Sequence, residues 1–180
     1  MDIEAIITDL FEREGGFVNH PADRGGPTNR GITLETLRSW RQHPVSVDEL
    51  KALSEVETRS IYRGRYLIAP RLHVIKDPYV LVLAFDCAVH HGPERAVEWL
   101  QEIVGVKVDG QLGPISEVAI NAYEPVRLYH RLIGRRLRFF GEIISHDPKL
   151  RYARQLGLRL QAEFAGGWCN RAAEFVELHL

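Results

Sequence analysis

Signals for helix starts recur along most of this chain and predict a mainly helical fold. Ser46-Val47-Asp48-Glu49 and Ser54-Glu55-Val56-Glu57 are both capping boxes, in which a serine and a glutamate satisfy backbone amides at a helix start. Asp77-Pro78 is a further start signal and precedes a nearly continuous apolar segment, typical of a central buried helix. Other helices are expected at about residues 3–14, 33–40, 94–104, 115–123, 125–144, past 160 and 168–180.

Length and charge limit the classes of protein to which the chain can belong. Its 180 residues fit one domain, 1–180, and the formal net charge of -1 gives no general attraction to nucleic acid or anionic membranes. No apolar run approaches the roughly 20 residues of a membrane span. The first twenty residues lack the apolar core of a signal peptide, so we expect a cytoplasmic origin and two reduced, mostly buried thiols, Cys87 and Cys169.

The stretch from Glu14 to Thr33 is rich in glycine, proline and polar side chains, and it could form a small β-hairpin within residues 15–33. Glu14 is expected in the last turn of a helix, where the helix dipole should raise its pKa toward that of a general acid. A solvated structural glutamate is the alternative. Asp23 follows nine residues later, and two carboxylates in different environments suit glycosidic bond cleavage, with Thr28 or Asn29 positioning a water.

Asp86 interrupts the apolar segment that follows Asp77. A carboxylate there needs a partner, and a structural hydrogen bond to backbone or to an arginine is the simplest interpretation. Cys87, His90 and His91, with His73, could form a zinc site, but no strong fourth ligand is suitably spaced. A core thiol with histidines at a helix end is the better interpretation, and we predict no metal.

Arginines cluster in the segment that follows Pro125. We interpret them as a solvated helix face whose aliphatic stems cover the core. They are Arg127, Arg131, Arg135, Arg136 and Arg138.

Four segments of the chain resemble one known family, glycoside hydrolase family 108, the N-acetylmuramidases. The first is Glu-Gly-Gly-Phe-Val-Asn-His-Pro-Ala-Asp-Arg-Gly-Gly-Pro-Thr-Asn-Arg-Gly-Ile-Thr at residues 14–33, and the second is Phe-Asp-Cys-Ala-Val-His-His-Gly at 85–92. Residues 99–114, with Trp-Leu-Gln, Val-Asp-Gly and Gly-Pro, are similar to the family's peptidoglycan-binding region. Residues 164–171 are similar to its closing segment.

The resemblance implies an all-α, lysozyme-like fold and assigns the catalytic acid to Glu14. Asp23 falls where phage-type lysozymes place a second catalytic carboxylate. Those enzymes have a threonine six residues further on, whereas here Thr28 is five and Asn29 six residues after Asp23. His90 stands where the family usually has asparagine. With these catalytic candidates, the predicted substrate-binding residues are Asn19, Asn29, Thr33, Tyr62, Asp86, His91 and Trp168.

By this resemblance the chain would hydrolyse the β-1,4 bond between N-acetylmuramic acid and N-acetylglucosamine, with no cofactor. Its partner would be the glycan strand of peptidoglycan, with no nucleic acid and no membrane insertion. The resemblance also implies a holin-like export partner, action on the wall in the periplasm and a role in export of a protein or toxin. Two alternatives stay open: a lytic transglycosylase, and a non-catalytic peptidoglycan-binding module built on residues 94–122.

Overall fold

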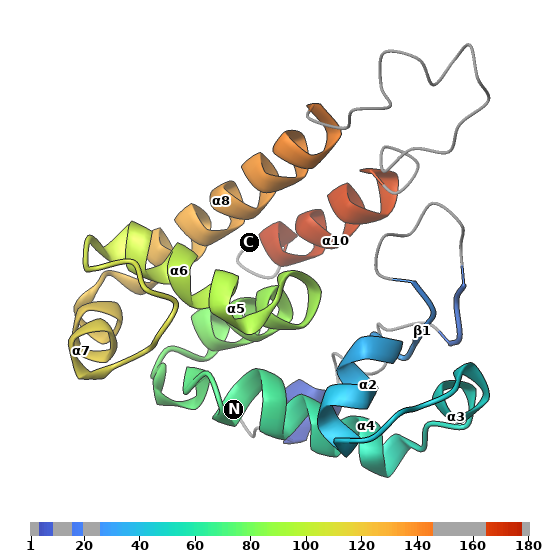
Figure 1. Ribbon diagram of the computed structural model, residues 1–180. Coiled ribbons are helices and arrows are strands. Elements are labelled where there is room, and N and C mark those ends of the chain that lie inside the picture. Colours follow the sequence, from blue (N-terminus) through green and yellow to red (C-terminus); the bar gives the residue numbers. More distant parts are fainter. Residues whose placement is uncertain (1–3, 9–15, 20–25, 146–164, 178–180) are drawn as a thin grey trace.

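The computed structural model of the chain describes residues 4–8, 16–19, 26–145 and 165–177, and it confirms a mainly helical, lysozyme-like fold (Figure 1). Residues 4–8 are helical. The strands are β1 (Thr28–Asn29) and β2 (Ile32–Thr33). The helices are α2 (Leu34–Arg41), α3 (Val47–Lys51), α4 (Glu55–Ile61), η1 (Tyr62–Ile68), η2 (Leu72–Val74), α5 (Pro78–His91), α6 (Pro93–Val104), α7 (Pro114–Ala122), α8 (Pro125–Ser145) and α10 (Ala165–Glu177).

Helix α5 lies at the centre of the molecule, as its apolar sequence predicts. It begins at Asp77, whose carboxylate accepts hydrogen bonds from the Tyr79 and Val80 amides. It packs against η1, α6 and α8, and its side chains from Val80 to Ala88 are mostly buried. Burial on nearly every side explains why the segment lacks the one-sided apolar stripe of a surface helix.

The helices that precede α5 begin where the sequence predicts. Thr33 accepts a hydrogen bond from the Thr36 amide at the start of α2, and Ser46 and Glu49 form the complete capping box of α3. Ser54 likewise caps α4. The helix that starts after Ser54 is not uniform, because α4 ends at Ile61 and continues as the π-helix η1 to Ile68. Such π segments are rare and often occur at functional sites.

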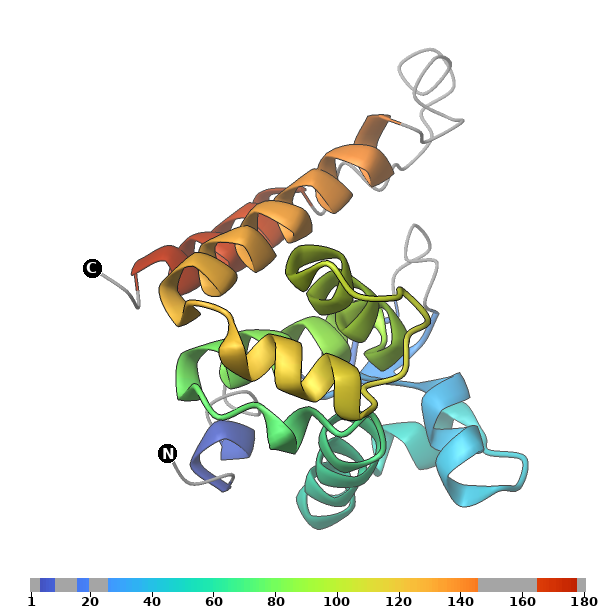
Figure 2. The ribbon, with the colours of Figure 1, turned by 90° about the vertical axis from the view of Figure 1, so that its left-hand side faces the viewer.

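Helices α8 and α10 lie side by side and antiparallel, along one edge of the molecule (Figures 1 and 2). The hydroxyl of Tyr129 on α8 donates to the carbonyl oxygen of Phe175 on α10. The closing helix begins at Ala165 rather than Trp168, so the exposed Gly166 and Gly167 do not end a helix. Packing of Ala172 and Phe175 in the core outweighs the weak helix propensity of two glycines.

Both cysteines are free thiols, as predicted, but only Cys87 is buried, while Cys169 is exposed on α10. Complete burial raises the pKa of the Cys87 thiol to about 12, as expected for an uncharged core side chain. Within the described ranges, no helix has both the length and the apolar character needed to cross a membrane.

Candidate functional site

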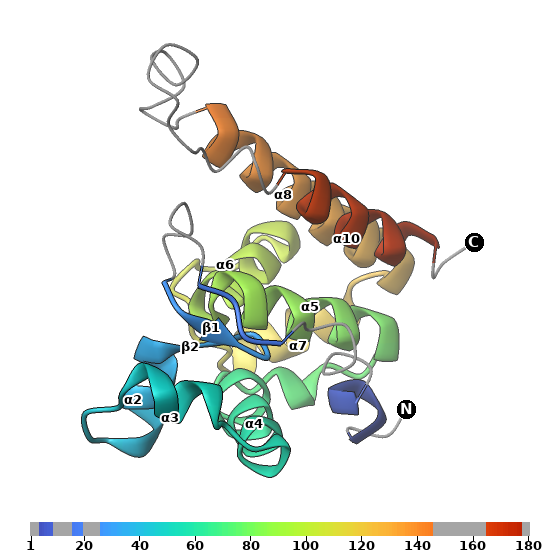
Figure 3. The same cartoon turned by 90° about the vertical axis from the view of Figure 1, so that its right-hand side faces the viewer.

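A small antiparallel hairpin forms the described part of the glycine-rich segment, as predicted. Thr28 pairs with Thr33 and Asn29 with Ile32, so Arg30 and Gly31 form a two-residue turn. Both turn residues have positive φ, 51° and 71°, as a type I′ turn requires. On the other side of β1, Val18 and Thr28 exchange backbone hydrogen bonds of 2.7 and 2.8 Å. These contacts place residues 16–19 against β1 (Figure 3).

Two buried side chains attach this hairpin to the helices beneath it. The Asn29 amide donates to the carbonyl oxygens of Leu50 and Lys51, at 2.8 and 3.1 Å, and so holds β1 against the end of α3. The Tyr62 hydroxyl donates to the carbonyl oxygen of Arg30 at 2.6 Å. Asn29 is 4% exposed and Tyr62 0%. Their contacts favour a structural role over the predicted contact with substrate, because neither side chain offers a surface to a glycan.

The other candidates in this segment are nearer to solvent. Asn19 is exposed beside the Val18–Thr28 pair. The Thr28 hydroxyl donates to the Gly26 carbonyl oxygen at 3.1 Å, and Thr33 both caps α2 and contacts the Thr36 hydroxyl at 3.0 Å. The two predicted catalytic carboxylates, at positions 14 and 23, lie outside the described residues, so their catalytic roles stay predictions.

Asp86 has the arginine partner that its burial requires. Its Oδ2 lies 2.7 Å from Nη1 of Arg136 on α8, and both side chains are 1% exposed. His90, one turn later on α5, lies 3.5 Å from Oδ1 of the same carboxylate. The structural interpretation of Asp86 is therefore confirmed, and its burial leaves no described route for the predicted direct contact with substrate.

Arg136 itself corrects the interpretation of the arginine run as a solvated face. The sequence carried a signal for this exception, because Arg136 continues the apolar positions Leu128 and Leu132 at intervals of four residues, before Phe140. An arginine in an apolar stripe, together with an aspartate in a buried helix, indicates a buried ion pair.

His91 and Trp168 belong to one aromatic cluster between α5, α6, α8 and α10. The His91 ring lies 5.2 Å from the ring of Trp99 and 5.3 Å from those of Phe139 and Phe140, between ring centres. Trp168 stacks on Phe140 at 5.2 Å and 15°. Burial, with a smaller effect of Arg136, lowers the pKa of His91 to about 2. These contacts explain His91 as a packing residue, and no described group of His, Cys, Asp and Glu could hold a metal ion.

Gln101, a buried residue of α6, holds the loop between α6 and α7 in place through side-chain hydrogen bonds. Its amide nitrogen donates to the Asp109 carboxylate at 2.9 Å, and its amide oxygen accepts from the Asp109 and Gly110 amides at 3.0 Å. The bond from Gln101 lowers the pKa of Asp109. Gly110 has φ 69°, a conformation that favours glycine, and a Cβ there would lie 2.6 Å from Glu94 Cγ, so the Glu94 side chain would have to move. The Val-Asp-Gly sequence is thus explained by loop structure.

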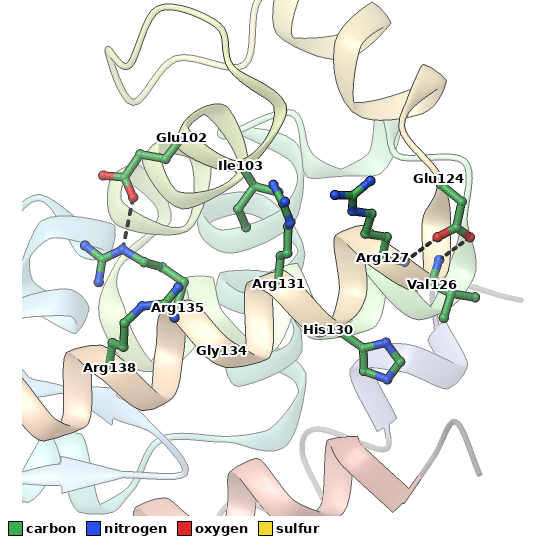
Figure 4. Close-up of a pocket in the computed structure, with 10 residues that line it drawn as sticks. All are labelled: Glu102, Ile103, Glu124, Val126, Arg127, His130, Arg131, Gly134, Arg135 and Arg138. Atoms are coloured by element: carbon green, nitrogen blue, oxygen red, sulfur yellow. Dashed lines mark hydrogen bonds and ion pairs between the residues drawn. The ribbon is translucent and has the colours of Figure 1, made fainter.

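A groove of about 740 Å³ lies between α6 and the start and middle of α8 (Figure 4). Four of the five clustered arginines line it, with two glutamates: Arg127, Arg131, Arg135, Arg138, Glu102 and Glu124. We call it the arginine groove. The sequence interpretation missed it, because helix periodicity places these arginines on one face without showing that α6 forms an opposite wall.

Comparisons with known proteins divide the chain at the start of α6. Residues 7–92 match the family described as Glycosyl hydrolase 108, and residues 95–173 match the family described as Predicted Peptidoglycan domain. Among solved structures, the chain is similar to SagA of Brucella abortus, with 32% sequence identity and a TM-score of 0.80. That match covers 96% of this chain and 90% of the SagA chain. No curated protein matches the chain.

Proposed function

The chain belongs to the glycosyl hydrolase 108 family, and from this premise we propose that it is an N-acetylmuramidase. Its two matched families describe a glycoside hydrolase that acts on peptidoglycan. The proposed bond is the β-1,4 linkage between N-acetylmuramic acid and N-acetylglucosamine. The observation that carries the proposal is the family match over residues 7–92, which includes the whole segment from Glu14 to Thr33 and its hairpin.

In the proposed mechanism, Glu14 acts as the general acid and protonates the oxygen of the leaving sugar. Asp23, ionised, stabilises the cationic transition state or activates water. The Thr28 hydroxyl gives its hydrogen to the Gly26 carbonyl, so its oxygen presents lone pairs that can accept a hydrogen bond from that water. Thr28 would therefore orient the water and not deprotonate it.

The hairpin contacts support this proposal because they hold residues 28–33, which follow Asp23 in the sequence, against α3 and η1. Catalysis depends on the position of reacting groups to within a fraction of an ångström. Tyr62 and Asn29 act here as positioning residues, since both anchor the hairpin backbone and neither is accessible.

Product analysis of digested sacculi tests the bond specificity. Purified sacculi are digested, the soluble fragments are reduced with borohydride, and the terminal sugars are identified by mass spectrometry. A muramidase leaves reduced N-acetylmuramic acid at the new ends. Reduced N-acetylglucosamine ends would contradict the proposal, and 1,6-anhydro ends would indicate a lytic transglycosylase. A binding module would pellet with the sacculi and release nothing.

The same proposal includes a place of action. Peptidoglycan lies outside the cytoplasmic membrane, so the enzyme would act in the periplasm, after passage through a holin-like partner, and would open the wall for an exported protein or toxin. In a producing bacterium, deletion of the gene for such a holin-like partner should leave the enzyme in the cytoplasmic fraction. Unchanged periplasmic recovery in that strain would contradict this route.

A further inference from the structure

We propose that the arginine groove binds the carboxylates of the peptide stems of peptidoglycan. This inference rests on the proposed function, because it concerns the same polymer that the enzyme cleaves. It adds a second binding site, with named residues, outside the segment from Glu14 to Thr33.

The arginines form a ladder along one face of α8. Arg127, Arg131 and Arg135 follow one another at intervals of four residues, and Arg138 comes three residues later. Side chains at these intervals share a helix face. With a rise of 1.5 Å per residue, the ladder is about 16 Å long. Figure 4 shows these side chains on the side of α8 that faces α6.

The groove carries an excess of positive charge. Its two carboxylates are already engaged: Glu102 accepts from Arg135 Nε at 3.0 Å, and Glu124 accepts from the Val126 and Arg127 amides at the start of α8. Arg127, Arg131 and Arg138 make no ion pair with any described residue, and all three are exposed. His130 also lines the groove. Three guanidinium groups are therefore available for an anionic ligand.

The shape of this face adds to the charge. Gly134 lines the groove between Arg131 and Arg138. Because glycine has no side chain, this part of the groove is open. A Cβ added at Gly134 would lie 3.8 Å from Arg138 Nη1. The Cζ atom of Arg131 lies 6.0 Å from the centre of the Tyr123 ring, within the range of a cation–π contact. The result is a hollow lined by planar guanidinium groups, whose paired N–H donors match the geometry of a carboxylate.

Peptide stems suit this groove better than the other anionic surfaces. The sugar hydroxyls and acetamides of the glycan are neutral, whereas the stem carries carboxylates at its glutamate, its diamino acid and its terminal alanine. A membrane headgroup layer favours a broad basic surface, whereas this groove is a hollow that contains two glutamates, on a chain of net charge -1.

All three ribbon views show the carboxyl end of α8 on the same side of the molecule as the hairpin (Figures 1, 2 and 3). The ladder thus leads toward the segment proposed to bind the glycan.

Calorimetric titration with a synthetic stem tetrapeptide, L-alanyl-γ-D-glutamyl-meso-diaminopimelyl-D-alanine, tests the inference without requiring any glycan cleavage. The full chain should bind it, and Arg127→Gln with Arg131→Gln should weaken binding at least about tenfold. The same peptide with amidated carboxyls should bind the unsubstituted protein about tenfold more weakly. Added salt should weaken binding of the acid form.

A matched control variant removes two positive charges at positions outside the arginine groove. Arg63 and Arg71 are half-exposed, pair with Glu4 and Glu117, and do not line the groove. The double variant Arg63→Gln with Arg71→Gln should bind the tetrapeptide within about twofold of the unsubstituted protein. Thermal unfolding checks that both double variants are folded.

Three results would overturn the inference: no tetrapeptide binding, equal binding of the amidated peptide, or equal losses in the groove and control variants. The protein could instead sediment with phosphatidylglycerol vesicles, lose this sedimentation on substitution of Arg127 and Arg131, and not bind the peptide. That result would assign the groove to a membrane. If the tetrapeptide binds as expected and sacculi are not cleaved, the proposed hydrolysis fails while the groove assignment holds.

Discussion

His91 shows how a single side chain links the packing of this protein to pH. It is a helix-end residue with three aromatic neighbours from α6 and α8. Burial, the positive charge of Arg136 and the adjacent His90 lower its pKa, and the negative charge of Asp86 only partly opposes them. His91 is therefore neutral in the folded protein and contributes an uncharged ring to the core.

This neutral state makes the free energy of unfolding depend on pH. The pKa of His91 is lower in the folded protein, about 2, than in the unfolded chain, about 6.5, so only the unfolded chain gains this proton as the pH falls below about 6.5. The stabilisation is complete above that pH and is lost as the pH falls. We expect a loss of about 2 kcal/mol at pH 5.

Urea unfolding at pH 7 and pH 5, with His91→Phe as the control, measures this effect. The phenylalanine variant keeps an aromatic ring in the cluster and removes the titrating group, so its free energy of unfolding should change less between the two pH values. Equal changes in both proteins would show that His91 does not cause the pH dependence.

At the scale of the elements, the Asp86–Arg136 ion pair joins three helices. Arg136 of α8 reaches Asp86 of α5, and its guanidinium lies 5.6 and 5.7 Å from the ring centres of Phe140 and Phe175, the latter on α10. A buried pair adds little net stability, but removal of one partner leaves an uncompensated buried charge. The pair therefore fixes the relative positions of α5, α8 and α10.

A double-mutant cycle tests this coupling. Arg136→Met and Asp86→Leu should each lower the free energy of unfolding by about 3–5 kcal/mol. The double variant should lose far less than the sum, because neither charge is then buried alone. Additive losses, measured by urea unfolding at pH 7, would contradict a direct interaction between the two side chains.

The starts of the elements could be predicted because caps are local. Asp77, Ser46 and Ser54 each satisfy amides within three residues, so the sequence window contains the whole interaction. The π-helix η1 was not predicted. Its first residue, Tyr62, bonds to the hairpin and packs against Phe85, whose ring centre lies 6.4 Å away, and a local sequence window does not contain such long-range contacts. The helical path through Gly166 and Gly167 likewise depends on packing against α8.

For the whole molecule, the fold class and the family followed from the sequence, whereas the burial of some predicted binding residues did not. The motif from Glu14 to Thr33 predicts the site segment, and this assignment stays a prediction. The sequence predicts Tyr62 as an aromatic ring that stacks on a sugar and Asn29 as a group that can position a water. In the structure both are buried, and they bond to the distant backbone of Arg30 and Leu50. The arginine groove was missed for the same reason, because its wall is formed by α6, about thirty residues away in the chain.

The central claim is that Glu14 provides the acid for peptidoglycan hydrolysis. The most direct measurement is release of soluble fragments from dye-labelled sacculi by the unsubstituted protein, by Glu14→Gln and by Glu12→Gln. We predict that Glu14→Gln folds normally, still binds sacculi and releases fragments at least about a hundredfold more slowly, as expected from loss of a general acid, while Glu12→Gln retains activity. Full release by the Glu14→Gln variant would contradict the account.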